Sequence, residues 1–317
     1  MAGVQKDSVD SRAPADCFSV LLHMQGIHTG VAARLRFQSP RQWLRLPLLL
    51  SFVLLLAACT SVSPIARRQG ADTLASSHGW QALRLPVRDF MLAGYAPPAA
   101  MADVLTIYIE GDGMAWLSPS RPSDDPTPLR PVALELALLH SHGTAAYLAR
   151  PCQYVQDAER RGCATPYWTD RRFAAEVVEA ASEAIDALKQ RYHASRLVLV
   201  GYSGGGAIAT LVAARRHDVV RLVTVAGNLE PLAWTRLHDL PPLAGSLNPA
   251  DAWRQLQDIP QVHFVGAEDT NVPRDVAAAY AARFPADKRP EIRVIDGASH
   301  TCCWASRWPT LAGMAFP

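Results

Sequence analysis

Short, mostly apolar runs alternate along the chain with longer segments in which apolar residues recur at helical spacing. Runs of this kind fit the strands of a parallel sheet that is covered on both faces. The expected strands cover residues 104–109, 145–149, 197–200, 219–225, 262–265 and 291–295, and the expected helices cover residues 132–140, 173–192, 207–216 and 273–284. The alternation of strand and helix predicts an α/β fold with a mostly parallel, doubly wound sheet.

Two more strands are expected upstream, over residues 80–85 and 87–92, on either side of Pro86. They predict an antiparallel hairpin at the edge of the sheet. Residues 117–131 are rich in proline, serine and aspartate and predict a surface loop.

The first 58 residues have the character of a leader. Basic residues Arg34, Arg36, Arg41 and Arg45 precede an apolar run at residues 46–58. That run is too short to span a bilayer comfortably and has the length of the core of a signal peptide. The segment before it is long, so a translation start at Met24 or later, which would make residues 1–23 an artefact, is an open alternative.

The apolar run ends in Leu56-Ala57-Ala58-Cys59, which resembles the lipobox of bacterial lipoproteins. The resemblance implies cleavage before Cys59, a diacylglyceryl group on its sulfur, and a periplasm-facing protein held in the cell envelope, with the outer membrane as the expected location. An ordinary signal peptide and a short membrane anchor are the alternatives. Small and polar residues at 59–78 predict a flexible tether, which leaves residues 79–317 for the folded domain.

Charge follows the same division. The leader holds six of the 31 basic residues and three of the 29 acidic ones, which leaves 25 basic and 26 acidic residues in the remainder. The slight basicity of the whole chain therefore belongs to the leader. A domain without excess positive charge does not fit nucleic-acid binding.

The six cysteines fall into three groups: Cys17 in the leader, Cys59 at the lipobox, and Cys152, Cys163, Cys302 and Cys303 in the domain. Export favours disulfides, and we favour Cys152–Cys163 because the two residues bracket a polar loop. Three pairings of the four domain cysteines are formally open. The adjacent pair would form a vicinal disulfide or stay reduced.

A metal site is not expected. The chain has neither C-x-x-C nor H-E-x-x-H, the common zinc patterns. His140 and His142 are two residues apart at the end of an expected helix, where they would point to different faces.

The most informative segment is Gly201-Tyr202-Ser203-Gly204-Gly205, between the strand at 197–200 and the helix at 207–216. Strand, sharp turn and helix around G-x-S-x-G form a nucleophile elbow, which projects the hydroxyl of Ser203 at a strained turn. A Cβ at position 201 or 205 would crowd the neighbouring strand and helix. A phosphate-binding loop is the alternative, but it would need Gly-Lys-Ser/Thr, and no lysine is near. This segment resembles the α/β-hydrolase superfamily.

The resemblance assigns residues to the other parts of a serine-hydrolase site. The strand at 104–109 ends in Glu110-Gly111-Asp112-Gly113, where the superfamily commonly has His-Gly-x, so Glu110 departs from the pattern while Gly111 and Asp112 match it. The amide of Gly204 and that of Asp112 or Gly113 are then the expected oxyanion donors. The alternative for the side chain of Asp112 is that it only shapes the loop.

The remaining two catalytic groups are expected after the last two strands. Asp269 stands in a Gly-x-x-Asp turn after the strand at 262–265 and is the expected acid, with Glu268 as the alternative. His300, in the loop after the strand at 291–295, is the expected base. The order Ser203, Asp269, His300 is that of the α/β-hydrolases. Cys302 and Cys303 follow the base directly. Either they form a redox-sensitive clamp on it, or, as we favour, they are a buried packing pair or a staple of the C-terminus.

The resemblance implies an α/β-hydrolase fold with a small cap over about residues 229–258, where proline, leucine and tryptophan interrupt the alternation. Trp234, Leu237, Leu243 and Leu247 of this segment either line an acyl pocket or pack it onto the core. The implied activity is hydrolysis of a small-molecule ester through an acyl-enzyme on Ser203, with no metal or organic cofactor. A peptidase or amidase on the same fold and a non-catalytic envelope binding protein are the alternatives.

Overall fold

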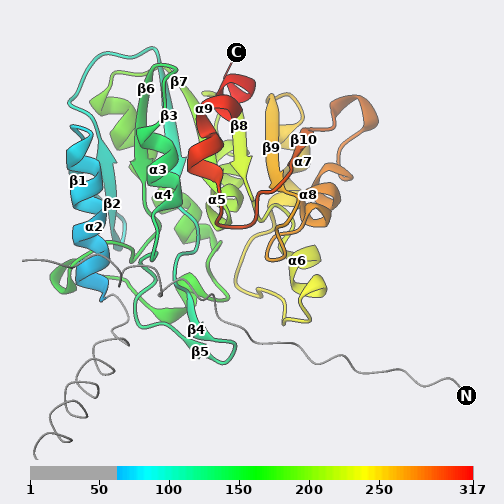
Figure 1. Cartoon of the computed structure of the whole chain (residues 1–317), viewed down its shortest axis with the longest axis horizontal. Coiled ribbons are helices and arrows are strands. Elements are labelled where there is room, and N and C mark those ends of the chain that lie inside the picture. Colours follow the sequence, from blue (N-terminus) through cyan, green and yellow to red (C-terminus); the bar gives the residue numbers. More distant parts are fainter. Residues whose placement is uncertain (1–62, 317) are drawn as a thin grey trace, which may run out of the picture. The chain divides into compact units, whose positions relative to one another are not determined.

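The computed structural model describes residues 63–316 (Figure 1). The leader, Cys17 and the lipobox cysteine Cys59 lie outside the described residues, so the predictions made for them stay predictions. Within residues 63–316, no helix is both long and apolar enough to cross a bilayer.

The described chain builds one mixed sheet of eight strands in the order β1-β2-β6-β3-β7-β8-β9-β10. Their bounds are β1 (Gln81–Val87), β2 (Phe90–Ala96), β3 (Val104–Ile109), β6 (Thr144–Leu148), β7 (Arg196–Tyr202), β8 (Val219–Val225), β9 (Gln261–Gly266) and β10 (Glu291–Ile295). β2 is antiparallel to both β1 and β6, and every pairing from β6 to β10 is parallel. The sequence prediction of a mostly parallel sheet is confirmed.

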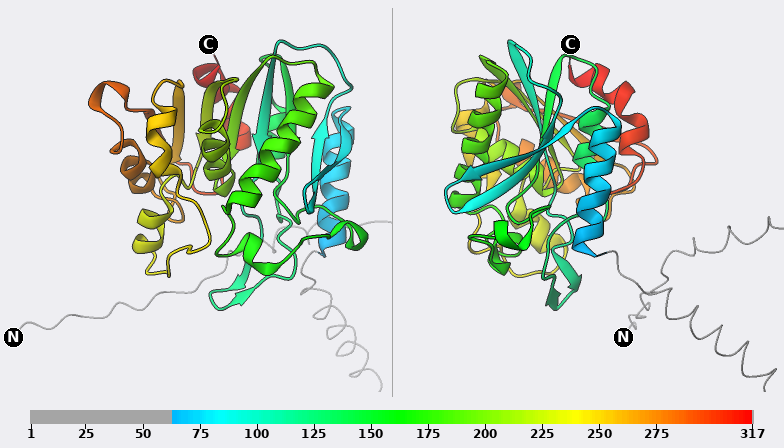
Figure 2. Two further views of the ribbon diagram at one scale, coloured as in Figure 1. Left: turned by 180° about the vertical axis from the view of Figure 1, so that it is seen from behind. Right: turned by 90° about the vertical axis from the view of Figure 1, so that its left-hand side faces the viewer.

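Helices cover both faces of this sheet (Figure 2). Their bounds are α2 (Pro64–Ser77), α3 (Val132–Leu138), α4 (Ala175–Arg191), α5 (Gly204–Ala213), α6 (Pro231–Leu237), α7 (Trp253–Leu256), α8 (Arg274–Ala281) and α9 (Trp304–Ala315). One apolar cluster contains the buried sides of α4, α5 and α8, and a second contains those of α2, α3 and α9. The two clusters form separate cores on the two faces of the sheet.

A small second sheet pairs β4 (Trp116–Ser118) with β5 (Arg121–Pro122). It interrupts the expected loop at 117–131 and lies beyond the end of β3, at the same end of the strands as α6 (Figure 1).

The edge hairpin turns at a different place from the one predicted. Pro86 lies within β1 and pairs with Met91, and the chain reverses at Arg88 and Asp89. Arg88 takes a positive φ of 48° there. Proline is tolerated because β1 is an edge strand, which can lack a donor on its outer side.

The expected flexible tether is wrong for most of its length, because residues 64–77 form helix α2. Ser63 caps this helix by accepting the amide hydrogen of Ala66, and Pro64 occupies the first turn, where its missing N–H costs nothing. Ala71 and Ala75 face the sheet and are buried. Small residues on one face let the helix pack closely, so the folded domain begins by residue 63.

Candidate active site

The nucleophile elbow forms as the sequence predicts. Ser203 joins β7 to α5 with φ 51° and ψ −123°, a conformation that a non-glycine residue adopts only under strain. A Cβ at Gly201 would lie 2.3 Å from the carbonyl oxygen of Gly205, and one at Gly205 would lie 2.3 Å from that of Ile109. Both glycines are therefore required for the turn, and α5 begins at Gly204, three residues earlier than expected.

Ser203, His300 and Asp269 form one hydrogen-bonded chain. The Oγ of Ser203 lies 3.0 Å from Nε2 of His300, and Nδ1 of His300 lies 2.9 Å from Oδ2 of Asp269. The other carboxylate oxygen of Asp269 accepts the amide hydrogens of Asn271 and Val272 at 2.9 and 2.8 Å. These distances suit a base that takes the proton of Ser203 while an acid orients its ring.

Glu268, the alternative acid, points elsewhere. Its side chain is exposed, whereas that of Asp269 is fully buried against His300. The structure therefore brings Asp269, and not Glu268, to the base.

Two residues that the sequence did not single out position His300. The hydroxyl of Tyr202 and the indole N–H of Trp304 both donate to its backbone carbonyl, at 3.0 and 2.9 Å. Tyr202 is the variable residue of G-x-S, and Trp304 opens α9. Neither position carries a pattern that points to this role.

The loop after β3 lies against the nucleophile. A Cβ at Gly111 would lie 3.2 Å from Cβ of Ser203. In the described chain the backbone amides of Gly204, Asp112 and Gly113 donate no hydrogen bond to another residue. These are the amides expected from the sequence, Gly204 together with Asp112 or Gly113, and they are free to donate to a ligand.

The carboxylate of Asp112 is held between two buried arginines. Arg150 contacts one oxygen at 3.1 Å and Arg172 the other at 2.8 Å. Burial would raise the pKa of Asp112, but the charges and hydrogen bonds of Arg172 and Arg150 outweigh it, so the pKa lies below its usual range. A Cβ at Gly204 would lie 2.0 Å from this carboxylate, so its position also excludes a side chain there.

Glu110, at the position where the superfamily commonly has histidine, is buried and forms hydrogen bonds with three neighbouring segments of the protein. Its side chain accepts the amide hydrogens of Gly111 at 2.9 Å and Ala133 at 3.4 Å, and the hydroxyl of Tyr147 at 3.2 Å. It thus joins the loop after β3 to the start of α3 and to β6. Burial raises the pKa of Glu110 to about 7, although these hydrogen bonds lower it.

The predicted cap segment forms α6, a short 3₁₀ turn at Pro249–Ala252 and α7. Trp234 links the two sides of the site, because its indole N–H donates to the carbonyl of Asn271 at 2.8 Å and its ring faces the guanidinium of Arg172 at 5.8 Å. Leu243 and Leu247 pack against the core, whereas Leu237 is exposed. The segment therefore braces the loops around Ser203, with only part of its apolar surface buried.

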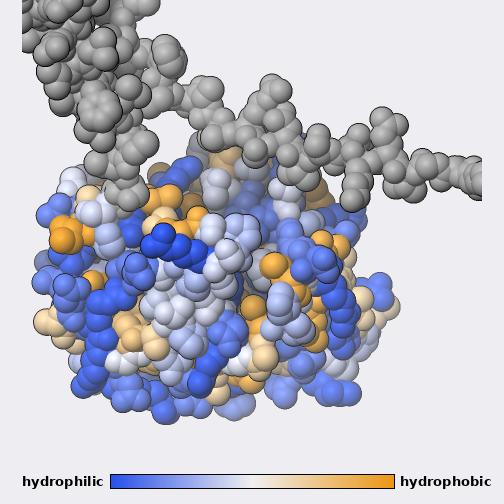
Figure 3. Space-filling view, turned by 90° about the horizontal axis from the view of Figure 1, so that it is seen from below, coloured by the Kyte–Doolittle hydropathy of each residue, from blue (hydrophilic) through white to orange (hydrophobic). Residues whose placement is uncertain are grey.

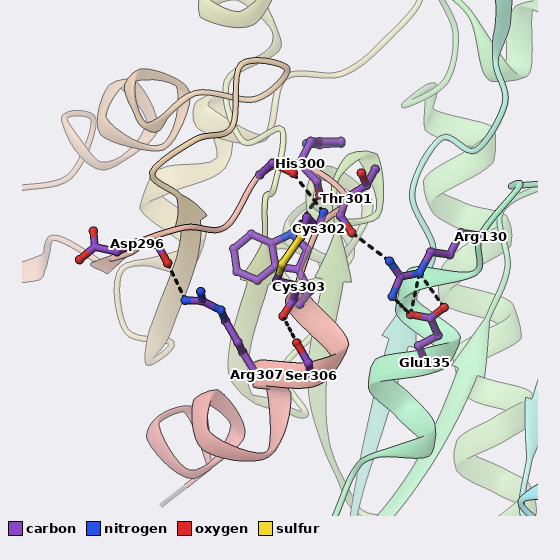
Figure 4. The surroundings of a disulfide bond; sticks show 11 residues. Arg130, Glu135, Asp296, His300, Thr301, Cys302, Cys303, Ser306 and Arg307 are labelled. Carbon is purple, nitrogen blue, oxygen red and sulfur yellow. Dashed lines mark hydrogen bonds and ion pairs between the residues drawn. A yellow bond between two sulfur atoms is a disulfide. The ribbon is translucent and has the colours of Figure 1, made fainter. Parts of the chain in front are cut away.

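Two disulfides are present in the described chain. Cys152–Cys163 is the pair favoured from the sequence, and it packs with Ala115 and Trp168. Cys302 and Cys303 are joined to each other in the loop between His300 and α9 (Figure 4). Cys302 is exposed, so the expectation of a buried packing pair is wrong for that residue.

Among residues 63–316, no group of three histidine, cysteine or acidic side chains is placed to hold a metal ion. His140 instead shares a hydrogen bond of 2.9 Å with the hydroxyl of Tyr108, and its ring packs against Phe316. Burial lowers the pKa of His140 to about 4.

The sheet order, the flanking helices and the elbow define the α/β-hydrolase fold. No protein-family model matches the sequence, and no curated protein matches it either.

Solved structures share the fold at low sequence identity. The α/β hydrolase GrgF from Penicillium sp. sh18 aligns with a TM-score of 0.52 and 13% identity, over 74% of this chain and 96% of that one. Est1E from Butyrivibrio proteoclasticus aligns with a TM-score of 0.51 and 14% identity, over the same two shares. Acylaminoacyl peptidase from Pyrococcus horikoshii aligns with a TM-score of 0.50 and 13% identity, over 70% of this chain. This chain spans 37% of that peptidase.

Proposed function

We propose that this protein is a serine hydrolase that cleaves carboxylic esters through an acyl-enzyme on Ser203. The observation that carries the proposal is the continuous hydrogen-bonded chain from Ser203 through His300 to Asp269, formed at a strained turn. The amide of Gly204, which donates to no other residue among those described, supports the same reaction, since acyl transfer needs a donor for the developing oxyanion.

In the proposed mechanism, Nε2 of His300 takes the proton of Ser203 as its oxygen attacks the carbonyl carbon of the ester. Asp269 stabilises the resulting imidazolium, and the amides of Gly204 and of Asp112 or Gly113 receive the negative oxygen. His300 then protonates the leaving alcohol. Water, deprotonated by His300, releases the acid and restores Ser203.

We also propose that the protein is a lipoprotein, anchored in the bacterial envelope through a lipid on Cys59. The lipobox sequence supports this, together with the short distance along the chain from Cys59 to the start of the folded domain. Replacing Cys59 by serine should release the protein from membranes. Unchanged membrane association of Cys59→Ser would contradict the lipid anchor.

The decisive test is labelling of the full-length protein with a fluorophosphonate, followed by peptide mass mapping. We expect one adduct, on Ser203, that disappears in His300→Ala and persists in Glu268→Gln, which alters an exposed neighbour of the acid. A folded protein that gives no adduct would favour the non-catalytic binding protein. Comparing turnover of matched esters and amides then separates an esterase from a peptidase or amidase.

A further inference from the structure

Exposed apolar side chains gather at one end of the described chain. Of its twelve exposed large hydrophobic residues, seven lie at the end of the sheet where the parallel strands finish. They are Ile65 on α2, Trp116 and Leu117 on β4, Leu129 in the loop before α3, Leu232 and Leu237 on α6, and Leu240 just after it. Four others, Met101, Leu139, Val220 and Met314, lie at the opposite end of the strands or helices, and Val294 lies on the outer strand β10.

Three of the segments that carry these residues adjoin the loops of the candidate active site. β4 follows the loop of Asp112, and the residue after Leu129, Arg130, donates to the carbonyl of Thr301 beside His300. α6 contacts the loop of Asp269 through Trp234 and Asn271. Figure 3 looks onto this end and shows hydrophobic residues in several groups, with hydrophilic residues between them. Ser203 and His300 are both partly exposed.

The start of the folded domain lies at the same end. In both views of Figure 2, α2 begins near the level of the β4–β5 hairpin. Arg67, in its first turn, donates to the carbonyl of Thr127 and forms an ion pair with Asp125, both in the loop that precedes α3. The helix therefore enters the domain beside the candidate active site.

Cys59 is four residues before Ser63, the cap of α2. A fully extended chain spans at most about 3.5 Å per residue, so a lipid on Cys59 would hold the membrane surface within about 14 Å of Ser63. A surface that close to α2 would lie beside the end that carries the exposed apolar residues. Tryptophan and leucine are side chains that enter the boundary between lipid headgroups and acyl chains.

We infer that this end of the domain rests on the membrane that holds the anchor, and that Trp116 and Leu117 enter the lipid and direct Ser203 to esters carried in that bilayer. The inference rests on the proposed lipid anchor and ester hydrolysis. It adds an orientation and a substrate class, an ester whose acyl chain lies in the membrane. The occupant of this apolar surface is thus a lipid bilayer.

The contact can be tested without measuring activity. Full-length lipidated protein is reconstituted in vesicles of phosphatidylethanolamine and phosphatidylglycerol with brominated acyl chains, which quench tryptophan fluorescence only within the bilayer. We expect the quenched fraction to fall in Trp116→Phe. Equal quenching of the wild-type protein and Trp116→Phe would overturn the membrane contact, whether or not the protein is a hydrolase.

The substrate class has its own test. Trp116→Ser with Leu117→Ser should lower hydrolysis of a long-chain ester embedded in the vesicles by about tenfold, because two large apolar side chains no longer enter the lipid. Hydrolysis of a short, water-soluble ester should not change. The matched control is Met101→Ser with Met314→Ser, at the opposite end, which should change neither rate.

The outcomes distinguish membrane-directed hydrolysis from the proposed esterase activity on which it rests. An equal loss on both esters, or the same loss in both variant pairs, would overturn membrane-directed hydrolysis. A wild-type protein that hydrolyses neither ester would instead contradict the proposed esterase activity, while the quenching result would still stand.

Discussion

The two sides of the candidate site, on either side of Ser203, are held in different ways. On one side, the loops of Asp269 and His300 are fixed by hydrogen bonds from the neighbouring amides of Asn271 and Val272 and from the side chain of Tyr202. On the other side, the loop after β3 is fixed by the buried ion pairs of Asp112 with two arginines and by the hydrogen bonds of the buried side chain of Glu110. The proposed acid–base side is thus held by neutral hydrogen-bond donors, whereas the proposed oxyanion side contains buried ion pairs, which carry a high cost of desolvation.

Because of this difference, we expect substitutions on the two sides to affect turnover and stability differently. Changes on the acid–base side should reduce turnover and leave the fold intact, because the groups involved are few and local. Changes on the oxyanion side should reduce stability as well, because each removes one member of a buried network.

The largest expected effect is on the acid–base side. Asp269→Asn should lower kcat for a short-chain ester by about 10⁴-fold, because the amide cannot hold His300 in the required tautomer or stabilise its cation. Glu268→Gln is the matched control and should retain activity within about twofold, since its side chain is exposed. Similar losses in the two variants would contradict the assignment of Asp269 as the acid.

On the oxyanion side, Asp112→Asn should cost about 3 kcal/mol or more in the free energy of unfolding, measured with urea. The substitution keeps the size of the side chain but leaves Arg150 and Arg172 buried without a counter-charge. Asp103→Asn is the control, because the ion pair of Asp103 with Arg196 is largely exposed and should contribute nothing measurable. A wild-type stability for Asp112→Asn would show that the buried arginines need no partner.

The pH dependence of stability tests Glu110. Its pKa is about 7 in the folded protein, against an ordinary value of 4.5. As pH rises between these values, the unfolded chain loses the proton while the folded chain keeps it, so the folded state loses stability until the pH passes about 7. Over this pH range the raised pKa of Glu110 lowers the free energy of unfolding by about 3 kcal/mol in total.

Glu110→Gln removes this titration and keeps an acceptor for the amide of Gly111. The stability of the wild-type protein relative to Glu110→Gln should therefore fall between about pH 5 and about pH 8, in urea unfolding at both values. A difference between the two proteins that does not change with pH would contradict a raised pKa at Glu110.

The same contrast explains how far the sequence could be read. The elbow and the loops of Asp269 and His300 are each a strand followed by a turn. Such signals are local, so the sequence pointed to three side chains that the structure brings within hydrogen-bonding distance. The clamp on Asp112 has no local signal, because Arg150 and Arg172 lie 38 and 60 residues away. The role of Glu110 depends on Tyr147 and Ala133, which only the fold brings to it.

Helix α2 was missed for another reason. Its buried face is made of Ala71, Ala75 and the shaft of Arg67, which give a weak hydrophobic pattern in a segment that otherwise reads as polar. Alanine packs well but contributes little apolar area, so periodicity does not distinguish such a helix from a linker.

The smallest expected effect concerns Cys302 and Cys303, which follow the base but form none of its hydrogen bonds in the described chain. His300 is held at its ring by Asp269 and at its carbonyl by Tyr202 and Trp304, and none of these contacts involves a sulfur atom. Cys302→Ser with Cys303→Ser should therefore change kcat/KM for a soluble ester by less than about threefold. By contrast, removal of the other disulfide by Cys152→Ser with Cys163→Ser should lower the free energy of unfolding by about 3 kcal/mol, because it opens a closed loop. A large fall in kcat at constant KM in the first variant would mean instead that the adjacent pair positions the base.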